Sequence, residues 1–229
     1  MSGTVAPNTT TNGLVLYLDA ANPRSYPGSG TTWYDMSRSG NDLKLSGSTP
    51  PAWNTTGGGS FYFDGSTSYA VIDSNSTLQI TKPTVIVICT TPVAGYSGIV
   101  MTRGQAGSYY NYGISSISTT AFSGVNTSCP NGVSGLTATT ATMNVYAAAW
   151  DGTAVQYYRN GVYAGSDTTC YSPNTSAGTR LSVGAALQND LSYASFFTGN
   201  IAVVQLYNRQ LSSAEIINNC NGIKSRYGI

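Results

Sequence analysis

The stretch that decides the fold class is MNVYAAAWDGTAVQYYRNGVYAG, residues 143–165. It contains three short runs of apolar, aromatic and β-branched residues, a composition typical of strands. Asn160-Gly161 separates the second run from the third, and a two-residue Asn-Gly loop favours a type I′ hairpin. Asp151-Gly152 separates the first run from the second. The stretch therefore predicts a three-stranded antiparallel meander.

The same alternation of short apolar runs and Gly, Asn, Asp or Pro residues continues on both sides of the meander. With the meander included, we expect strands at Leu14–Asp19, Ser60–Phe63, Tyr69–Ile72, Thr84–Thr91, Gly98–Arg103, Tyr109–Ser115, Ala121–Val125, Met143–Trp150, Ala154–Arg159, Val162–Gly165, Arg180–Val183 and Asn200–Tyr207. A β-sandwich often reaches 229 residues as one domain. We predict an all-β domain over residues 13–229, preceded by an arm of residues 1–12.

One helix is signalled, near the C-terminus. Ser212 and Glu215 have the spacing of a capping box, and Leu211 and Ile216 are placed for a hydrophobic staple. The apolar face is formed by Ile216, Ile217 and Cys220. Gly222 is a natural stop. We expect about two turns of helix, packed on an edge of the sandwich.

Charge and hydropathy exclude several partners. Only 8% of the residues are charged, the net charge is +1, and the Lys and Arg residues are scattered from Arg24 to Arg226. A nucleic-acid surface needs cations gathered on one face, so we expect no nucleic-acid partner. Apolar runs are too short to span a membrane, so we expect no membrane partner either. The segment Met1–Pro7 lacks the pattern of a secretory signal peptide, which predicts synthesis in a cytoplasm without export by that route.

The four cysteines are too few and too widely spaced for a disulfide scaffold. Cys89 lies in an apolar run and Cys220 in the predicted helix, so both are interpreted as core residues. Cys129 and Cys170 lie in loop-like segments and are the candidates for a disulfide, although a reducing cytoplasm favours free thiols. Because the chain has no histidine, a zinc site would need all four thiolates.

Several segments resemble the laminin G-like, concanavalin A-like jelly-roll domains found in virion proteins of tailed bacteriophages. They are GLVLYLDA (13–20), NPRSYPGSGTTWYD (22–35), SFYFDG (60–65), YAVI (69–72), AWDGT (149–153), YRNGV (158–162), GNIAVVQLYNRQLS (199–212) and IKSRYGI (223–229). A divergent middle extends from about residue 92 to 142. The resemblance implies a two-sheet antiparallel jelly-roll sandwich with one short C-terminal helix.

The resemblance also bears on function, although the fold alone does not choose among the roles of its members. Relatives bind sugars, bind proteins, or serve as structural parts of fibres and capsids. We therefore predict a virion protein, a capsid decoration, head-fibre or tail-associated component, present in multiple copies beside other virion proteins. Adhesion to a host surface or a cell-surface glycan is a further role. The alternative is a stand-alone carbohydrate-binding lectin.

Catalysis is not expected. Retaining glycoside hydrolases, which share this architecture, need two carboxyl groups about 5 to 5.5 Å apart. The chain has one glutamate, Glu215, which the helix cap explains better, and no two of its eight aspartates lie two residues apart. Without histidine a Ser-His-Asp arrangement is impossible. A cross-strand pair of aspartates remains the only route to an enzyme.

A metal site is the next alternative. The resemblance implies that some relatives hold calcium at the rim of the sandwich, and Asp19 and Asp64 occupy motif positions that could supply charge. Ala202 stands where many relatives carry an acidic residue, which weakens this reading. We favour the interpretation that Asp35 and Asp64 cap turns through their side chains, and we expect no cofactor.

Tyrosines are the remaining candidates for binding. Tyr109, Tyr110 and Tyr112 lie in a Gly- and Ser-flanked segment of the divergent middle, and Tyr96 is near in sequence. Such residues suit sugar stacking or protein contacts, because they are apolar with a polar tip. The simpler alternative, which we favour, is that they pack on a sheet face. The tryptophans are expected to anchor the core or its rim: Trp33, Trp53 and Trp150.

Overall fold

A computed structural model describes residues 9–90, 96–104, 110–118, 121–125, 136–137, 142–168, 178–188 and 190–229. Its strands are β1 (Leu14–Asp19), β2 (Thr32–Trp33), β3 (Leu43–Ser46), β4 (Ala52–Asn54), β5 (Ser60–Asp64), β6 (Tyr69–Ile72), β7 (Thr84–Thr90), β8 (Ser97–Arg103), β9 (Tyr110–Ser118), β10 (Ala121–Val125), β11 (Leu136–Thr137), β12 (Met143–Trp150), β13 (Val155–Arg159), β14 (Val162–Asp167), β15 (Arg180–Val183), β16 (Ala186–Leu187), β17 (Tyr193–Ala194) and β18 (Thr198–Tyr207). The helices are α1 (Ser213–Ile223) and the short 3₁₀ turns η1 (Thr56–Gly58), η2 (Ser76–Leu78) and η3 (Lys224–Tyr227).

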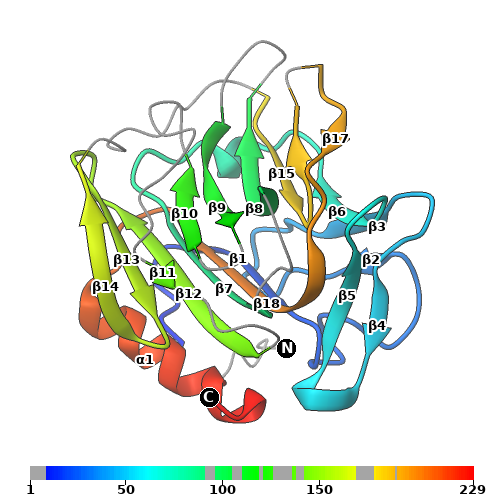
Figure 1. Cartoon of the computed structure of the whole chain (residues 1–229), viewed down its shortest axis with the longest axis horizontal. Coiled ribbons are helices and arrows are strands. Elements are labelled where there is room, and N and C mark those ends of the chain that lie inside the picture. The colour runs from blue at the N-terminus through cyan, green and yellow to red at the C-terminus, as the bar shows by residue number, and fades with distance from the viewer. Residues whose placement is uncertain are drawn as a thin grey trace.

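Two antiparallel sheets pack face to face (Figure 1). Sheet A has the strand order β14-β13-β12-β7-β18-β5-β4, and β1 pairs with the C-terminal half of β18. Sheet B has the order β11-β10-β9-β8-β15-β6-β3-β2. The strands β16 and β17 form a separate small ladder. This is the two-sheet jelly-roll sandwich predicted from the sequence.

The main core lies between the sheets. Its largest side chains include Trp33, Phe61, Phe63, Tyr112, Tyr146, Trp150 and Phe197. Trp33 and Trp150 are fully buried there. Trp53 lies at the rim, where its indole N–H donates to the Ala20 carbonyl over 2.9 Å. The three tryptophans therefore anchor the core and its rim, as expected.

A second apolar cluster covers the outer face of sheet A. Side chains of β7, β12 and β18, among them Ile86, Val145 and Val203, pack beneath Ile216 and Cys220 of α1. Figure 1 shows α1 lying across this side of the molecule. A sheet face buried under a helix loses its polar-out alternation, and this explains why β7 is apolar on both faces.

The capping box of α1 is present as predicted: Ser212 Oγ accepts from the Glu215 amide, and the Glu215 side chain accepts from the Ser212 amide. The predicted end was wrong. The helix passes through Gly222 to Ile223 and continues into η3, and it is Gly228, at φ 70°, that adopts the left-handed conformation of a stop. Packing of Ile223 on sheet A extends the helix beyond the glycine.

The meander over residues 143–165 is confirmed. Asn160 and Gly161 have φ values of 52° and 85°, and Arg159 pairs with Val162, as a type I′ turn requires. At the other turn Trp150 pairs with Val155, and the Asp151 carboxylate accepts from the Ala154 amide. Its loop is therefore four residues long.

Cys89 and Cys220 are free and buried, as the sequence indicated. Burial raises the pKa of both thiols, that of Cys220 to about 12. Cys129 and Cys170 lie outside the described residues. No helix in the described part of the chain is long and apolar enough to cross a membrane.

Candidate functional site

The outer face of sheet B carries the most distinctive polar and aromatic groups. Leu181 and Val183 of β15 point into the core, so Arg180 and Ser182 lie on the outer face. Arg180 pairs with Arg103 of β8, and Ser182 pairs with Val71 of β6. The neighbouring strands β6, β15 and β8 therefore share one outer surface.

The β16–β17 hairpin lies over this surface and is tied to it by three hydrogen bonds. Gly98 donates to the Ser195 carbonyl (2.9 Å), Arg103 Nη1 to the Leu187 carbonyl (2.6 Å) and Ser182 Oγ to the Ala185 carbonyl (2.7 Å). The approach at Gly98 is so close that an added Cβ would lie 2.6 Å from the Ala185 carbonyl carbon. Only glycine fits there, so the sequence holds the hairpin against the sheet.

The backbone of the hairpin is also strained. Leu191 and Ser195 have φ values of 66° and 49°, in the left-handed region that side chains with a Cβ rarely adopt. Asp190 stabilises the tip by accepting hydrogen bonds from the Ser192 amide and hydroxyl. Strain that the surrounding contacts maintain is typical of segments positioned for binding.

Three aromatic rings gather where the hairpin meets β6. The rings of Tyr69 and Tyr193 stack with their centroids 4.0 Å apart and an interplanar angle of 23°, and the Phe196 ring lies 6.4 Å from Tyr69. All three side chains are half-buried. We call Tyr69, Tyr193 and Phe196 the tyrosine platform.

Two opposite charges flank the platform. Leu181 pairs with Ile72, so the antiparallel register places Arg180 opposite Asp73. Burial is the largest effect that raises the pKa of Tyr193, to about 12, and the neighbouring Tyr69 is the second. The negative charge of Asp73 adds to this rise, whereas the positive charge of Arg180 opposes it. The Tyr193 hydroxyl is therefore protonated near neutral pH and lies in the field of both charges. The site offers an aromatic surface, a hydroxyl donor, a carboxylate and a guanidinium.

The tyrosines singled out in the sequence divide between two environments. Tyr96 and Tyr110 come together, half-buried, on the outer side of sheet B beside Ser115, and the Arg103 guanidinium lies 4.7 Å from the centre of the Tyr110 ring. Burial raises the pKa of Tyr96 above its usual range. Tyr112 instead lies in the core, where its hydroxyl donates to the Leu78 carbonyl over 2.8 Å. Tyr109 is outside the described residues.

The platform residues were missed in the sequence. Tyr69 lies in a predicted strand, and Tyr193 and Phe196 belong to the aromatic run YASFF at 193–197. This aromatic run directly precedes the predicted strand Asn200–Tyr207 and was the available signal for a binding site. Nothing in it showed that the segment folds back across sheet B.

Both weak metal candidates are engaged with protein groups. Asp64 Oδ1 accepts hydrogen bonds from the amides of Ser66, Thr67 and Ser68. Burial favours the neutral form of this carboxyl group, but the hydrogen bonds outweigh burial. The pKa of Asp64 therefore lies below its usual range. Both Asp19 oxygens accept from Arg226 Nη1, at 2.7 and 2.8 Å. Within the described ranges no three acidic or cysteine side chains cluster. These two carboxylates do not form the charged oxygen cage that calcium prefers.

Asp35 and Asp64 serve as the turn caps that we favoured. Asp35 Oδ1 accepts from the amides of Tyr17 and Ser37, both over 2.8 Å. Ala202, at the position where relatives carry an acidic residue, is fully buried beneath α1. A carboxylate there would lie in an apolar cluster.

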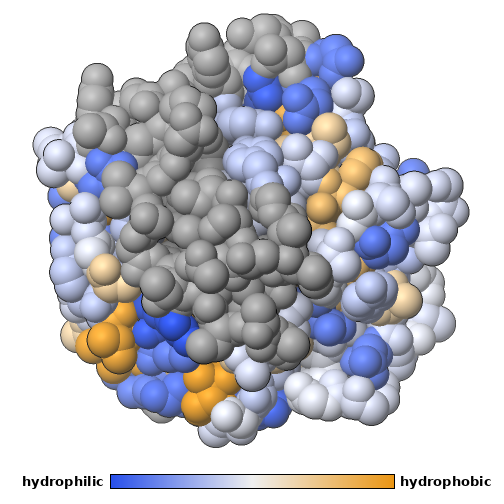
Figure 2. Space-filling model, viewed as in Figure 1, coloured by the Kyte–Doolittle hydropathy of each residue, from blue (hydrophilic) through white to orange (hydrophobic). Residues whose placement is uncertain are grey.

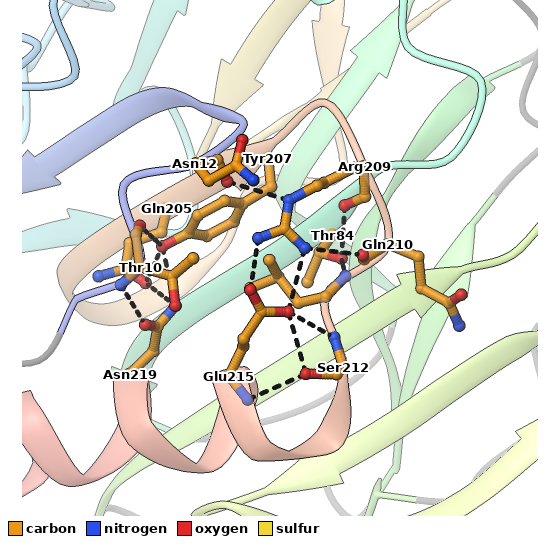
Figure 3. Close-up of polar contacts among 11 residues, drawn as sticks. Thr10, Asn12, Thr84, Gln205, Tyr207, Arg209, Gln210, Ser212, Glu215 and Asn219 are labelled. Carbon is orange, nitrogen blue, oxygen red and sulfur yellow. Dashed lines mark hydrogen bonds and ion pairs between the residues drawn. The ribbon is translucent and has the colours of Figure 1, made fainter.

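Glu215 is held in its ionised form. The hydrogen bond from Arg209 is the largest effect that lowers the pKa of Glu215, to about 2. Burial opposes this shift, and hydrogen bonds from the amide and hydroxyl of Ser212 add to it. Figure 3 shows Glu215 between Arg209 and Ser212 at the start of α1. A general acid for glycoside cleavage needs a raised pKa, so this group is tuned in the opposite direction.

Comparison with solved structures shows what shares this fold. Trypanosoma rangeli sialidase in complex with the inhibitor DANA matches with a TM-score of 0.65 and 16% sequence identity. The match covers 96% of this chain and 35% of that chain, so this chain spans about a third of the length of the sialidase. Domain 4 of AbnA, a GH43 extracellular arabinanase from Geobacillus stearothermophilus, in complex with arabinotriose, matches with a TM-score of 0.66 and 14% identity, over 90% of this chain and 98% of that chain. The botulinum neurotoxin serotype G binding domain matches with a TM-score of 0.62 and 14% identity, over 90% of this chain and 50% of that chain.

At these identities the likeness shows the fold. A search of curated protein sequences gave no match. The family model for laminin G-like domains of the concanavalin A-like lectin/glucanases superfamily matches residues 64–217, about two thirds of the chain. The matched region includes β6 to β18, which belong to both sheets and the small ladder, together with the platform and the first turn of α1, and it leaves out β1 to β4 and nearly all of β5. The chain therefore belongs to the concanavalin A-like lectin/glucanases superfamily.

Proposed function

We propose that this domain binds carbohydrate through the tyrosine platform. The observation that carries the proposal is the stacked, half-exposed pair Tyr69 and Tyr193, which the tethered hairpin holds on the outer face of sheet B. An aromatic face packs against the C–H groups of a sugar ring, and polar groups at its edge bond to the hydroxyls. Arg180 and Asp73 supply a donor and an acceptor beside the rings.

A structural neighbour of similar size supports this proposal. Domain 4 of AbnA has almost the same extent as this chain and was solved in complex with arabinotriose. The match covers nearly all of that domain, whereas the sialidases extend far beyond the matched region. In extent, this chain therefore resembles a single domain solved with an oligosaccharide more than a complete sialidase.

The proposed activity is non-catalytic. Glu215 is ionised and held by Arg209 on the side of sheet A, away from the platform. Asp64 and Asp19 are engaged in a turn cap and an ion pair. These carboxylates lack the freedom and the raised pKa that a general acid requires.

We further propose that the domain acts in a phage virion, as a multi-copy structural component beside other virion proteins. The sequence resemblance to virion jelly rolls supports this role. The arrangement of the chain suits it, because Thr10 donates to Asn219 of α1, so that residue 10 and the C-terminal helix lie together on the side of sheet A. Attachment through that side would leave the platform facing outward. Mass spectrometry of purified particles tests the location, and a glycan-binding protein absent from particles would favour the stand-alone lectin instead.

The binding proposal is tested with the full chain on a glycan array, followed by calorimetry with the best ligand. Tyr193→Ala removes one ring of the stack and should weaken binding at least about tenfold, as the loss of one stacking contact with its buried area implies. Tyr62→Ala is the matched control, since Tyr62 is exposed on β5 of the other sheet. If Tyr193→Ala retained the wild-type Kd, the platform would not be the binding site.

A further inference from the structure

A cavity of about 330 Å³ lies where the start of β1 meets the loop between β2 and β3. It is lined by Thr11, Leu14, Met36, Ser37 and Arg38. Its volume falls within the range of small-molecule sites, about 300 to 1,000 Å³. Leu14 and Met36 are buried and form the interior of the cavity, whereas Thr11 and Arg38 are exposed and form its rim. The cavity therefore combines an apolar interior with a polar rim.

The cavity and the tyrosine platform lie on different sides of the sandwich. Leu14 and Met36 belong to the apolar cluster on the outer face of sheet A. The Met36 amide donates to the Tyr17 carbonyl of β1 over 2.9 Å. This hydrogen bond brings the loop across to sheet A, although β2 and β3 belong to sheet B. A ligand in the cavity would therefore not touch the platform.

Asp35 fixes the shape of the loop and uses all of its acceptor capacity to do so. Its Oδ1 accepts from the amides of Tyr17 and Ser37, and its Oδ2 accepts from the Ser37 hydroxyl (2.7 Å) and the Asn41 amide (3.0 Å). A carboxylate offers about four lone-pair sites, and these four donors occupy them. Asp35 therefore holds the loop in place and has no acceptor left for the neighbouring Arg38.

Arg38 has a backbone conformation that favours glycine. Its φ is 81°, in the left-handed region that residues with a Cβ rarely adopt. The two ion pairs within the described ranges involve other arginines, so the exposed guanidinium of Arg38 has no carboxylate partner there. Asp42, the other acidic residue of the loop, accepts from the Asp35 amide. Backbone strain at an unpaired charge is typical of positions that hold a ligand.

An unpaired cation beside apolar side chains is uncommon on this molecule. Only 8% of the residues are charged, against about 25% in an average soluble domain. Figure 2 shows the described residues of one face mostly in white and blue, with hydrophobic residues in small separate patches. The cavity therefore suits a ligand that carries both a negative charge and apolar groups.

The lining indicates the chemistry of that ligand. A guanidinium binds a carboxylate through two parallel hydrogen bonds. The Thr11 hydroxyl can donate and accept, and Ser37 Oγ, which donates to Asp35 and accepts from the Ser39 amide, keeps one lone pair. These groups suit the hydroxyls of a ligand, and the apolar interior suits its C–H groups. A fatty acid would leave the protein hydroxyls unused, and an inorganic anion would leave the apolar interior empty.

We propose that this cavity binds a small hydroxylated carboxylate, an acidic monosaccharide, for which glucuronate is the probe. The carboxylate would bind Arg38, and the ring hydroxyls would meet Thr11 and Ser37. The C–H groups of the ring would face Leu14 and Met36. Because this site does not include the tyrosine platform, the proposal does not depend on glycan binding there. The two proposals can fail separately.

The test is a titration of the full ¹⁵N-labelled chain with glucuronate, followed by NMR. We expect a Kd of about 1 mM, as suits a ligand of about thirteen non-hydrogen atoms, with amide shifts centred on residues 36–38. Two matched probes separate the features of the ligand, since glucose lacks the carboxylate and cyclohexanecarboxylate lacks the hydroxyls. Each should bind at least fivefold more weakly than glucuronate. Methyl glucuronide distinguishes the source: binding equal to that of glucuronate indicates the end of a sugar chain, and weaker binding indicates the free acid.

Two variants test the site from different sides. Arg38→Gly removes the guanidinium and relieves the backbone strain, so it should weaken glucuronate binding at least tenfold while the Tm stays close to that of the wild type. A purely structural role of Arg38 would lower the Tm and leave binding unchanged. Thr11→Trp should obstruct the rim and weaken binding to a similar degree. Lys44→Ala is the matched control, because it removes an exposed cation from β3 of sheet B, and Tyr193→Ala should also keep the wild-type Kd.

Circular dichroism checks that each variant is folded. A wild type without amide shifts at about 10 mM glucuronate overturns the proposal, since a Kd of about 1 mM would give near saturation there. An Arg38→Gly variant with the wild-type Kd overturns it as well. Glucose that binds as tightly as glucuronate also contradicts it, because the guanidinium would then have no role in recognition.

Discussion

Glu215 makes a contribution to stability that is larger than a helix cap alone provides. Its carboxylate accepts from Arg209 Nη1 at 3.0 Å and from the Ser212 amide at 2.9 Å. Arg209 also donates through Nε to the Asn12 carbonyl, so the pair links the N-terminal segment to α1 (Figure 3). Replacing Glu215 with Gln removes the negative charge that both the ion pair with Arg209 and the cap of α1 use.

The magnitude follows from the pKa. Its lowering from 4.5 to about 2 in the folded state corresponds to at most about 3 kcal/mol. The two side chains are 29% and 30% exposed, so solvent screening reduces this, and we expect about 2 kcal/mol at pH 7. The cap alone accounts for about 1 kcal/mol. For a domain of this size the Glu215→Gln variant should melt about 4 to 8 °C lower.

The pH dependence gives an independent check. Because the folded pKa is depressed, the stabilisation is fully present above the unfolded pKa of about 4.5 and is lost as the pH falls toward 2. Thermal melts followed by circular dichroism should therefore show a full gap between wild type and Glu215→Gln at pH 7. The gap should have shrunk to less than half near pH 2.5.

A double-mutant cycle separates the ion pair from the cap. Arg209→Gln should lower stability as well, and the double variant should lose less than the sum of the two single changes, with a coupling of about 1 kcal/mol. Strict additivity, or a Glu215→Gln variant within about 0.3 kcal/mol of wild type at pH 7, would refute the reasoning.

Three further outcomes are expected. Gly98→Ala should displace the hairpin, because the new methyl would meet the Ala185 carbonyl carbon, and calorimetry should show weakened glycan binding together with a lower Tm. Asp64→Asn should cost about 1 to 2 kcal/mol in denaturant unfolding, since the carboxylate caps a turn through three amides, and millimolar calcium should leave the wild-type Tm unchanged. Cys89 and Cys220 should react with a thiol reagent only after unfolding, and rapid labelling of either in the native state would contradict their burial.

The long strands could be predicted because local signals and tertiary packing agree. Leu14–Asp19 and Met143–Trp150 begin and end where the sequence placed them, since apolar runs bounded by turn residues fill a sheet that is covered on both sides. Six short strands were not predicted: β2, β3, β4, β11, β16 and β17. Two to four residues carry too little periodicity to distinguish a strand from a loop.

The helix shows where local rules yield to packing. Ser212 and Glu215 started it where predicted, because a cap depends on residues three positions apart. Gly222 did not stop it, because Ile223 gains an apolar contact with sheet A by continuing the helix. The cost of one glycine in a helix is about 1 kcal/mol, which the burial of one isoleucine exceeds.

The candidate site was hidden from the sequence for a related reason. Tyr69 and Tyr193 are 124 positions apart, and their rings meet only because the hairpin folds back over β8 and β15. The groups that permit this are a glycine at position 98 and two residues with left-handed backbone, none of which resembles a binding motif. In a fold whose strands serve many functions, the proposed binding specificity therefore depends on where one short hairpin is tethered. The tether combines one backbone hydrogen bond from Gly98 with hydrogen bonds from the Arg103 and Ser182 side chains to carbonyls of the hairpin segment.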